Sequence, residues 1–418
     1  MVYQPPAGAR DLLPLDVAQK RWIEKRLRSR FQRWGYHRII TSTLERLDTL
    51  MAGGAIARST VIQFQDADDE ILGLRPELTA SIARTAVTRM ASTTFPQRLY
   101  YNANVFRRDN EGDRGQQQEF YQAGVELLGA GGILADAEIL LLLADCLQNL
   151  GLGGVSAIVG EAGLTRSLLE PFPTALRESV RRAISHLDRV ALETLPLSPE
   201  LRQRALFLFD LRGRPQDVLQ QLAHLDLDAS ARSALENLKA LFELLDEHRT
   251  AIVPHADSGL TTSILNSIVL DLSLIQTLDY YTGIVFEVVV ETESGTRILG
   301  QGGRYDRLLS LYHPQGEAFP GIGFALNLED LQQALQPTGQ LPDRTSPSDW
   351  LVVAKTAHSE AATLAYAQKL RQSAHLVRVE VALGDLQTPE AVRDYAKCRQ
   401  IGNIAWIDAD GSSEIETL

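Results

Sequence analysis

The stretch Gln276-Thr277-Leu278-Asp279-Tyr280-Tyr281-Thr282-Gly283-Ile284-Val285-Phe286-Glu287 is followed shortly by Gly302-Gly303-Arg304-Tyr305-Asp306. The β-branched and aromatic residues of 284–290 predict a strand, and with the polar segment 291–296 and the next apolar run they predict a hairpin. Its rim would carry three tyrosine rings and several carboxylates, a lining that suits a small, flat ligand that is cationic or forms hydrogen bonds. From spacing alone, tyrosines packed into an ordinary core remain the alternative. The residues of this rim are Tyr280, Tyr281, Tyr305, Asp279, Glu287 and Asp306.

The composition is that of a globular protein with two or three domains, with 418 residues, 44% of them hydrophobic and 22% charged. A formal net charge of −12 argues against non-specific polyanion binding but leaves room for a local basic face. Cys146 and Cys398 lie far apart, which indicates a reducing compartment without a disulfide framework. We find no Cys/His spacing typical of a metal site, no secretory signal and no apolar run long enough to span a membrane. The sequence therefore predicts a cytoplasmic protein without metal or membrane contact.

The opening stretch resembles the histidine-specific signature of the histidyl-tRNA synthetases, in its Leu-Asp-Tyr-Tyr, its Val-Phe-Glu and its Gly-Gly-Arg-Tyr-Asp. In that family an arginine and a glycine immediately precede Leu-Asp-Tyr-Tyr. Gln276 and Thr277 stand at those positions here. The resemblance thus implies a histidine pocket that lacks one of the cations needed for adenylation.

The N-terminal region resembles the first motif of class II aminoacyl-tRNA synthetases, a helix and a strand that form a two-fold interface. The helix is predicted over Asp16 to Trp34, with Asp16 as N-cap, and the strand over Tyr36 to Thr43. Ser42 replaces the family's proline near the strand end. The resemblance implies a homodimer, and the basic residues on the polar side of the helix are interpreted as a solvated face.

Two further segments resemble the parts of the synthetases that bind the amino acid and ATP. Leu74-Arg75-Pro76-Glu77-Leu78-Thr79 matches a motif whose acid and hydroxyl hold the amino group of histidine. Without the resemblance, Glu77 and Thr79 would be ordinary first-turn residues of a helix. The second class II motif is a strand pair in which Arg107 occupies the place of the arginine that binds the α-phosphate. Its return strand carries Gln122 and Glu126, which the resemblance assigns to histidine.

Three arginines that the synthetases use on the phosphates of ATP are replaced in this chain, by Gln118, Gln276 and Asp330. Asp330 lies in Asn327-Leu328-Glu329-Asp330, which resembles the third class II motif. An aspartate opposite a polyphosphate reverses an attraction worth roughly 4 kcal/mol per charge pair near a protein surface. Because such enzymes stabilise transferring phosphates mainly by charge, the replacements predict a chain without aminoacylation activity.

The predicted architecture is α+β, with a class II synthetase-like antiparallel sheet, flanking helices and a small C-terminal α/β domain. We assign 1–335 to the core, with a helical insertion at about 160–260 that includes a helical pattern over Ala175 to Leu192, 336–348 to a linker and 349–418 to a shortened anticodon-binding-like domain. From Asp349 onward ten acids outnumber seven Lys and Arg, and 384–390 offers no cation. Phosphate contacts need Lys and Arg, so no tRNA partner is expected.

The regulatory subunits of ATP phosphoribosyltransferase are the family that combines this fold with these losses. The resemblance implies a non-catalytic subunit of histidine biosynthesis that binds a short catalytic subunit, relays feedback by histidine and needs no cofactor. The alternatives are a divergent histidine–tRNA ligase, with cations from Arg108 or Arg114, and a histidine-sensing module for another partner. The residues implied for histidine are Glu77, Thr79, Arg107, Gln122, Glu126, Tyr280, Tyr281 and Tyr305.

Overall fold

The computed structural model describes residues 5–6, 8–54, 56–108, 117–252, 264–274, 281–293, 295–384 and 388–418. The chain forms two compact units, Met1–Pro342 and Asp343–Leu418. Of the predicted site, Gln276, Asp279 and Tyr280 lie outside the described residues, and so does Arg114.

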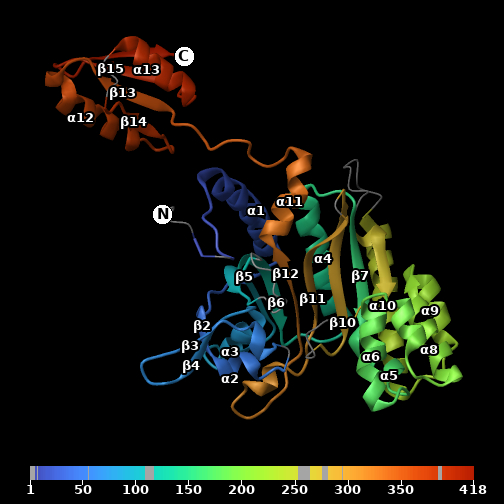
Figure 1. Cartoon of the computed structure of the whole chain (residues 1–418). Helices are drawn as coiled ribbons and strands as arrows, with labels where there is room; N and C mark the ends of the chain where they lie inside the picture. Colours follow the sequence, from blue (N-terminus) through green and yellow to red (C-terminus); the bar gives the residue numbers. More distant parts are fainter. Residues whose placement is uncertain are drawn as a thin grey trace. The chain divides into compact units, whose positions relative to one another are not determined.

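A mixed, mainly antiparallel sheet forms the centre of the first unit (Figure 1). Its middle strands pair antiparallel, whereas β1 pairs parallel with β5 and β7 pairs parallel with β9. The predicted hairpin is confirmed, with Val285 opposite Gly303 and a β-bulge between Val288 and Val289. In spatial order the strands of the described chain are β1 (His37–Arg38), β5 (Gln97–Phe106), β6 (Glu119–Leu128), β12 (Gly321–Asn327), β11 (Gly295–Arg304), β10 (Ile284–Thr292), β7 (Val155–Glu161), β9 (Ile268–Asp271) and β8 (Arg212–Gly213).

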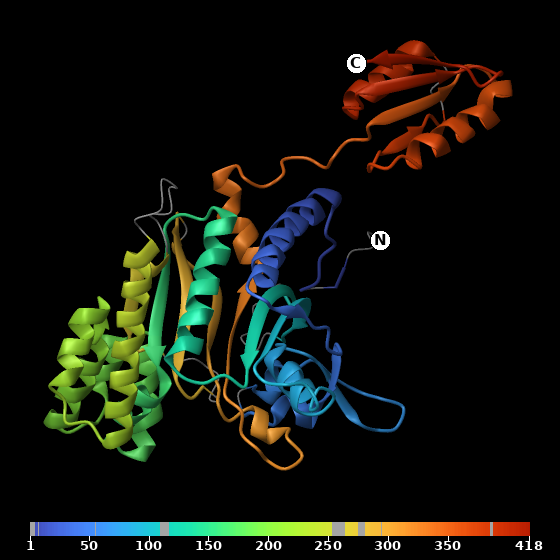
Figure 2. The same cartoon turned by 180° about the vertical axis from the view of Figure 1, so that it is seen from behind.

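The two faces of this sheet carry different partners. Helices α1 (Pro14–Arg33), α4 (Ile133–Leu150) and α11 (Leu328–Leu335) cover one face, where Ala123, Val125 and Leu127 of β6 are buried (Figure 2). Helix α3 (Thr79–Val87) packs on the other face, against a separate apolar cluster. Because side chains alternate along a strand, Gln122 and Glu126 of β6 face the α3 side.

Helix α1 begins two residues earlier than predicted. Pro14 is its first residue, and Asp16 accepts a hydrogen bond from the Leu13 backbone N at 2.9 Å, so Asp16 caps the helix from its third position. Ile23, Leu27 and Phe31 recur at helical spacing and are buried. The predicted strand over Tyr36 to Thr43 is shorter in the structure, because only His37–Arg38 pairs with β5.

A small three-stranded sheet precedes α3 and positions the chain that enters it. Strands β2 (Leu44–Arg46), β4 (Ile71–Leu74) and β3 (Gln63–Gln65) pair antiparallel, and α2 (Leu47–Met51) follows β2. After β4, the buried Arg75 donates from Nε to Asn104 O at 2.9 Å and from Nη1 to Thr41 O at 3.0 Å. These bonds tie the segment that carries Glu77 to β5.

The insertion is helical, as predicted, but one predicted helix is interrupted. The pattern over Ala175 to Leu192 forms two helices, because Leu187 adopts a φ of 55° and Asp188 caps the second one by accepting from Ala191 N at 2.8 Å. The helices are α5 (Ala162–Leu169), α6 (Thr174–Ser185), α7 (Arg189–Thr194), α8 (Pro199–Asp210), α9 (Pro215–Ala223) and α10 (Ala229–Ile252).

The second unit is a four-stranded sheet with a helix on each face. β13 (Trp350–Ala354) pairs parallel with β14 (Val379–Val381) and β15 (Asn403–Ile407). An edge strand that the sequence reading did not anticipate, β16 (Ser413–Thr417), pairs antiparallel with β15. The helices are α12 (Glu360–Arg371) and α13 (Pro389–Cys398). Within the described part of the chain, neither unit has a helix long and apolar enough to cross a membrane.

Candidate functional site

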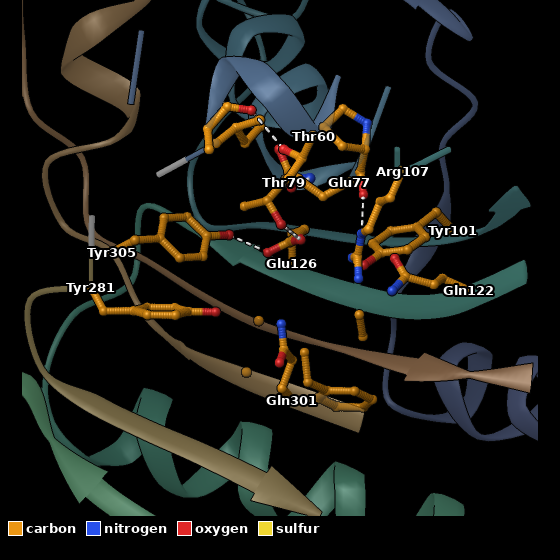
Figure 3. Close-up of a pocket in the computed structure, with 17 residues that line it drawn as sticks. Thr60, Glu77, Thr79, Tyr101, Arg107, Gln122, Glu126, Tyr281, Gln301 and Tyr305 are labelled. Carbon is orange, nitrogen blue, oxygen red and sulfur yellow. Dashed lines mark hydrogen bonds between the residues drawn. The ribbon is translucent and has the colours of Figure 1, made fainter. Parts of the chain in front are cut away.

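A cavity of about 350 Å³ opens on the α3 side of the main sheet (Figure 3). Its walls come from β5, β6, β11 and β12 and from the segment that enters α3. The structure brings seven of the predicted site residues together here: Glu77, Thr79, Arg107, Gln122, Glu126, Tyr281 and Tyr305. The remaining one, Tyr280, lies outside the described residues.

Glu126 is the polar centre of the cavity. Thr79 Oγ1 donates to Glu126 Oε1 at 2.7 Å, and the Tyr305 hydroxyl donates to Oε2 (Figure 3). The residue is only 1% exposed. Burial raises the pKa of the Glu126 carboxyl to about 8, the two hydroxyl donors oppose the shift, and the nearby Glu77 adds to it. Burial therefore disfavours the carboxylate form of Glu126 in the empty cavity, and a cationic ligand would favour it.

Glu77 serves both the helix and the cavity. Its carboxylate accepts from the backbone N of Ala80 at 2.9 Å and from that of Thr79, so it caps the first turn of α3. It also lines the cavity, where burial raises its pKa and the charge of Arg107 opposes that rise. The first-turn interpretation and the ligand interpretation of Glu77 are thus compatible.

Arg107 and Gln122 line the side of the cavity toward the third motif. Arg107 directly follows β5 and donates from Nε to Pro76 O at 2.9 Å. Gln122 Nε2 donates to Asn327 Oδ1 at 3.0 Å. Arg107 is the single cation among the described residues that line the cavity.

The polar lining residues that were not predicted from the sequence are Thr60, Tyr101 and Gln301. Tyr101 is buried on β5 and shares the α3 side with Leu99, two residues earlier. That two-residue period was the signal that could have identified Tyr101. Gln301 lies between Gly300 and Gly302, immediately before the quoted Gly302 to Asp306, and pairs with Glu287 across the hairpin.

Two glycines on β12 make room for the polar side chains. A Cβ on Gly323 would lie 2.1 Å from Glu126 Oε2, and one on Gly321 would lie 2.3 Å from the Tyr305 ring. Contacts this short do not occur between real side chains, so neither position accepts a larger residue without moving the group beside it.

The acidic rim predicted from the hairpin is wrong for two of its three carboxylates. Asp306 accepts from Arg304 Nη1 at 3.0 Å, and the buried Arg304 also pairs with Asp136 at 2.5 Å. Glu287 lies on β10, beside Gln301 of β11, and does not line the cavity. The charged residue that affects its carboxyl is Asp271. Asp279 falls outside the described residues.

Of the three residues that replace cations, Asp330 and Gln118 make other contacts, and Gln276 lies outside the described residues. Asp330 pairs with Arg297 Nη1 at 2.9 Å. The backbone of Gln118 bridges two segments, since its carbonyl accepts from Arg107 N at 2.9 Å and its N–H donates to Gly8 O at 2.8 Å. Arg108, considered as a substitute cation, is not among the described lining residues. No cluster of three His, Cys, Asp or Glu that could hold a metal occurs in the part of the chain that the structure describes.

Comparison with known proteins first defines the class. The family model described as histidyl-tRNA synthetase matches residues 8–331. A solved histidyl-tRNA synthetase from a Nostoc species superposes with a TM-score of 0.72 at 20% identity and covers 100% of this chain and 94% of its own. The fold is therefore that of the class II synthetases related to histidyl-tRNA synthetase.

More similar relatives then define the family. The ATP phosphoribosyltransferase regulatory subunits of Nostoc punctiforme and Trichormus variabilis are 62% and 61% identical, each over 100% of both chains. A Bacillus halodurans structure described as an ATP phosphoribosyltransferase regulatory subunit/histidyl-tRNA synthetase has a TM-score of 0.78 at 26% identity, with 97% of this chain and 98% of that one covered. This chain belongs to the family of ATP phosphoribosyltransferase regulatory subunits.

Proposed function

We propose that this chain binds a short catalytic ATP phosphoribosyltransferase subunit, activates it and transmits feedback by histidine through its cavity. Full-length identity of 62% to a protein named as the regulatory subunit supports the pairing. The observation that carries the ligand assignment is the buried Glu126 carboxyl, held by Thr79 and Tyr305 inside a cavity of amino-acid size.

Histidine fits the polar groups of this cavity in one orientation. Its imidazole N–H donates to Glu126, and its ring lies between Tyr281 and Tyr305. Its ammonium is placed at Glu77 and Thr79, with the Gln122 amide oxygen nearby. Its carboxylate is placed at Arg107, the cation that lines the cavity. The same proposal places the Gln276 amide at this carboxylate and the Tyr280 hydroxyl at the imidazole.

The charge distribution favours regulation over a divergent histidine–tRNA ligase. Adenylation needs several cations on the phosphates of ATP, and the described lining supplies Arg107 alone. Asp330 forms an ion pair with Arg297 at 2.9 Å, so this position offers no free cation to a phosphate. The remaining alternative, a histidine-sensing module for another partner, would have the same pocket. It is distinguished from the proposed function by whether the chain binds the short catalytic ATP phosphoribosyltransferase subunit.

Calorimetry with the purified chain tests the ligand. We expect the chain to bind histidine selectively. The affinity should be about tenfold lower than with an arginine in place of Gln276, because a neutral hydrogen bond to the histidine carboxylate is worth about 1–2 kcal/mol less than a charge-assisted one. Glu126→Ala should remove most of the binding, whereas Glu126→Gln keeps the hydrogen-bond acceptor and should lose less. The ligand assignment is wrong if Glu126→Ala changes neither binding nor feedback.

Mixing with the short catalytic subunit tests the partner. The mixture should elute as a larger hetero-oligomer and form product faster than the catalytic subunit alone. An inactive mixture in which the two chains elute separately would contradict the regulatory assignment.

We further propose a cytoplasmic homodimer without a tRNA partner, built around α1 and the segment after it.

A further inference from the structure

Two polar side chains that line the Glu126 cavity, Tyr101 and Gln301, form no hydrogen bond with any described residue. By contrast, Thr79 and Tyr305 both donate to Glu126 in the same cavity. Tyr101 is only 2% exposed, and a hydrogen-bonding group at this depth is costly to leave without a partner. The Tyr101 hydroxyl and the Gln301 amide are therefore the groups of the cavity wall that a ligand would satisfy.

The register of the sheet puts these two side chains at opposite ends of one row. Tyr101 of β5 is paired with Gly124 of β6, and Gly124 with Ala325 of β12. Ala325 is paired in turn with Gln301 of β11. Directly paired residues share a face of the sheet, so all four belong to the α3 side. The Tyr101 hydroxyl reaches over Gly124, because a Cβ there would lie 2.5 Å from it.

The floor between the two polar ends consists of small residues. Gln301 follows two strands after Gly124, so its backbone lies roughly 10 Å from that glycine at the usual strand spacing. Neither Gly124 nor Ala325 has an atom beyond Cβ, so a ligand group can lie directly over them. Figure 3 shows the Tyr101 ring and the Gln301 amide directed into the cavity from different sides. A group that lies over this floor therefore meets a hydroxyl and an amide.

Both polar ends can donate to an anion. The Gln301 amide has two N–H donors, and the Tyr101 hydroxyl has one. Burial and the neighbouring acids Glu126 and Glu77 raise the pKa of Tyr101, so its hydroxyl keeps the proton that it donates. The positive charge of Arg107 opposes this rise, and Arg107 lines the same cavity. An anion can therefore contact Arg107 and Tyr101 together.

We propose that Tyr101 and Gln301 hold the α-carboxylate of the bound amino acid, beside Arg107. This inference rests on the proposed function, in which the cavity binds histidine. A carboxylate accepts about four hydrogen bonds, and Arg107 is the only cation that the described lining offers it. Two neutral donors satisfy lone pairs that Arg107 leaves open. The cavity should therefore select a free carboxylate over an alcohol at the same position.

Calorimetry on the full chain with histidine and with histidinol, which has an alcohol in place of the carboxylate, tests the assignment. Tyr101→Phe and Gln301→Ala should each bind histidine at least about tenfold more weakly, because each removes a hydrogen bond to a charged group. Both variants should bind histidinol as the parent chain does. Tyr100→Phe is the matched control, since it removes a hydroxyl from the next residue of β5, which is buried on the opposite face. It should bind both ligands normally.

Gln301→Glu tests the sign of the ligand charge at this end of the row. The added carboxylate would repel a ligand carboxylate, so the affinity for histidine should fall further than in Gln301→Ala. Stronger binding would mean that the ammonium or the imidazole lies at Gln301, and would overturn the assignment. Equal losses for histidine and histidinol would also overturn it, because they would mean that Tyr101 and Gln301 only shape the cavity.

The outcome for the proposed function is read separately from Glu126→Ala. Unchanged histidine binding in Tyr101→Phe and Gln301→Ala, together with a loss in Glu126→Ala, would overturn the carboxylate assignment and leave the proposed function standing. A parent chain that binds no histidine would overturn both.

Discussion

The Asp330 carboxylate accepts a hydrogen bond from Arg297 Nη1 at 2.9 Å, across the contact between α11 and β11. Both side chains are about one-third exposed, so the pair contributes on the order of 0.5–1 kcal/mol. Its larger effect is on charge. In this chain Asp330 stands where the synthetases resembled by its motif have a phosphate-binding arginine. Its charge is neutralised by Arg297.

Restoring an arginine at this position should not restore adenylation. Asp330→Arg places a like charge beside Arg297 and leaves Gln118 and Gln276 unchanged, so we expect a slightly lower melting temperature and no histidine-dependent pyrophosphate exchange. Asp330→Asn is the control, because it removes the pair without adding repulsion. Exchange clearly above background in Asp330→Arg would contradict the assignment of a non-catalytic chain.

Glu126 should make stability depend on pH. Its pKa is about 8 in the folded protein against an ordinary 4.5, so between these values the unfolded chain releases a proton that the folded one retains. The stability contribution of this group therefore falls as pH rises from about 5 to 8. Glu126→Gln does not titrate, and its melting temperature relative to the parent chain should increase over this range. A difference that is constant with pH would refute the shift.

Gly323 should be required both for ligand binding and for the close approach of β12 to β6. Gly323→Ala adds a carbon 2.1 Å from Glu126 Oε2, which must displace the carboxyl from Thr79 and Tyr305. We expect histidine binding to fall at least about tenfold, as the loss of one or two hydrogen bonds implies. Gly153→Ala is the control, since a Cβ there meets nothing within 4 Å. Because the same carbon would lie 2.3 Å from the backbone O of Val125, we also expect a lower melting temperature for Gly323→Ala than for Gly153→Ala. Unchanged histidine affinity and melting temperature in Gly323→Ala would count against the described packing.

Arg304 should be essential to stability although its motif first indicated a ligand site. Arg304→Met leaves Asp136 without its partner at 2.5 Å, and breaking a buried pair in this way costs about 3–5 kcal/mol. Adding Asp136→Asn removes the uncompensated charge and should recover part of that loss. Urea unfolding of the two variants and of Asp136→Asn measures the coupling. Strictly additive effects would show that the pair is not coupled.

The proposed dimer can be tested at Ile40, which follows the edge strand β1 and is 77% exposed. In an isologous interface one substitution acts twice. Ile40→Asp should therefore shift the light-scattering mass from dimer toward monomer. Leu376→Asp is the control, because Leu376 is equally apolar and 82% exposed but belongs to the second compact unit. A parent chain that is monomeric at micromolar concentration would rule out the interface.

Local patterns predicted the hairpin, and the family resemblance implied the fold class and seven of the residues that line the cavity. They did not predict the ion pairs of Arg304. This residue ends β11 and pairs with Asp306 and with Asp136 of α4, which lies 168 residues earlier in the chain. The Arg304–Asp136 pair depends on where α4 packs on the sheet, which no short segment contains. The interruption at Leu187 was missed because a positive φ is rare for leucine, so its sequence pattern did not indicate a break.

The glycines that border the Glu126 cavity also limit how the site can change. Glycine has no side chain to shorten, so every substitution at Gly321 or Gly323 adds atoms toward Tyr305 or Glu126. Along this wall, single mutations can make the cavity smaller but never larger. A variant that accepts a bulkier amino acid must therefore arise at lining residues whose side chains have atoms to lose, such as Tyr101, Thr79 and Tyr281.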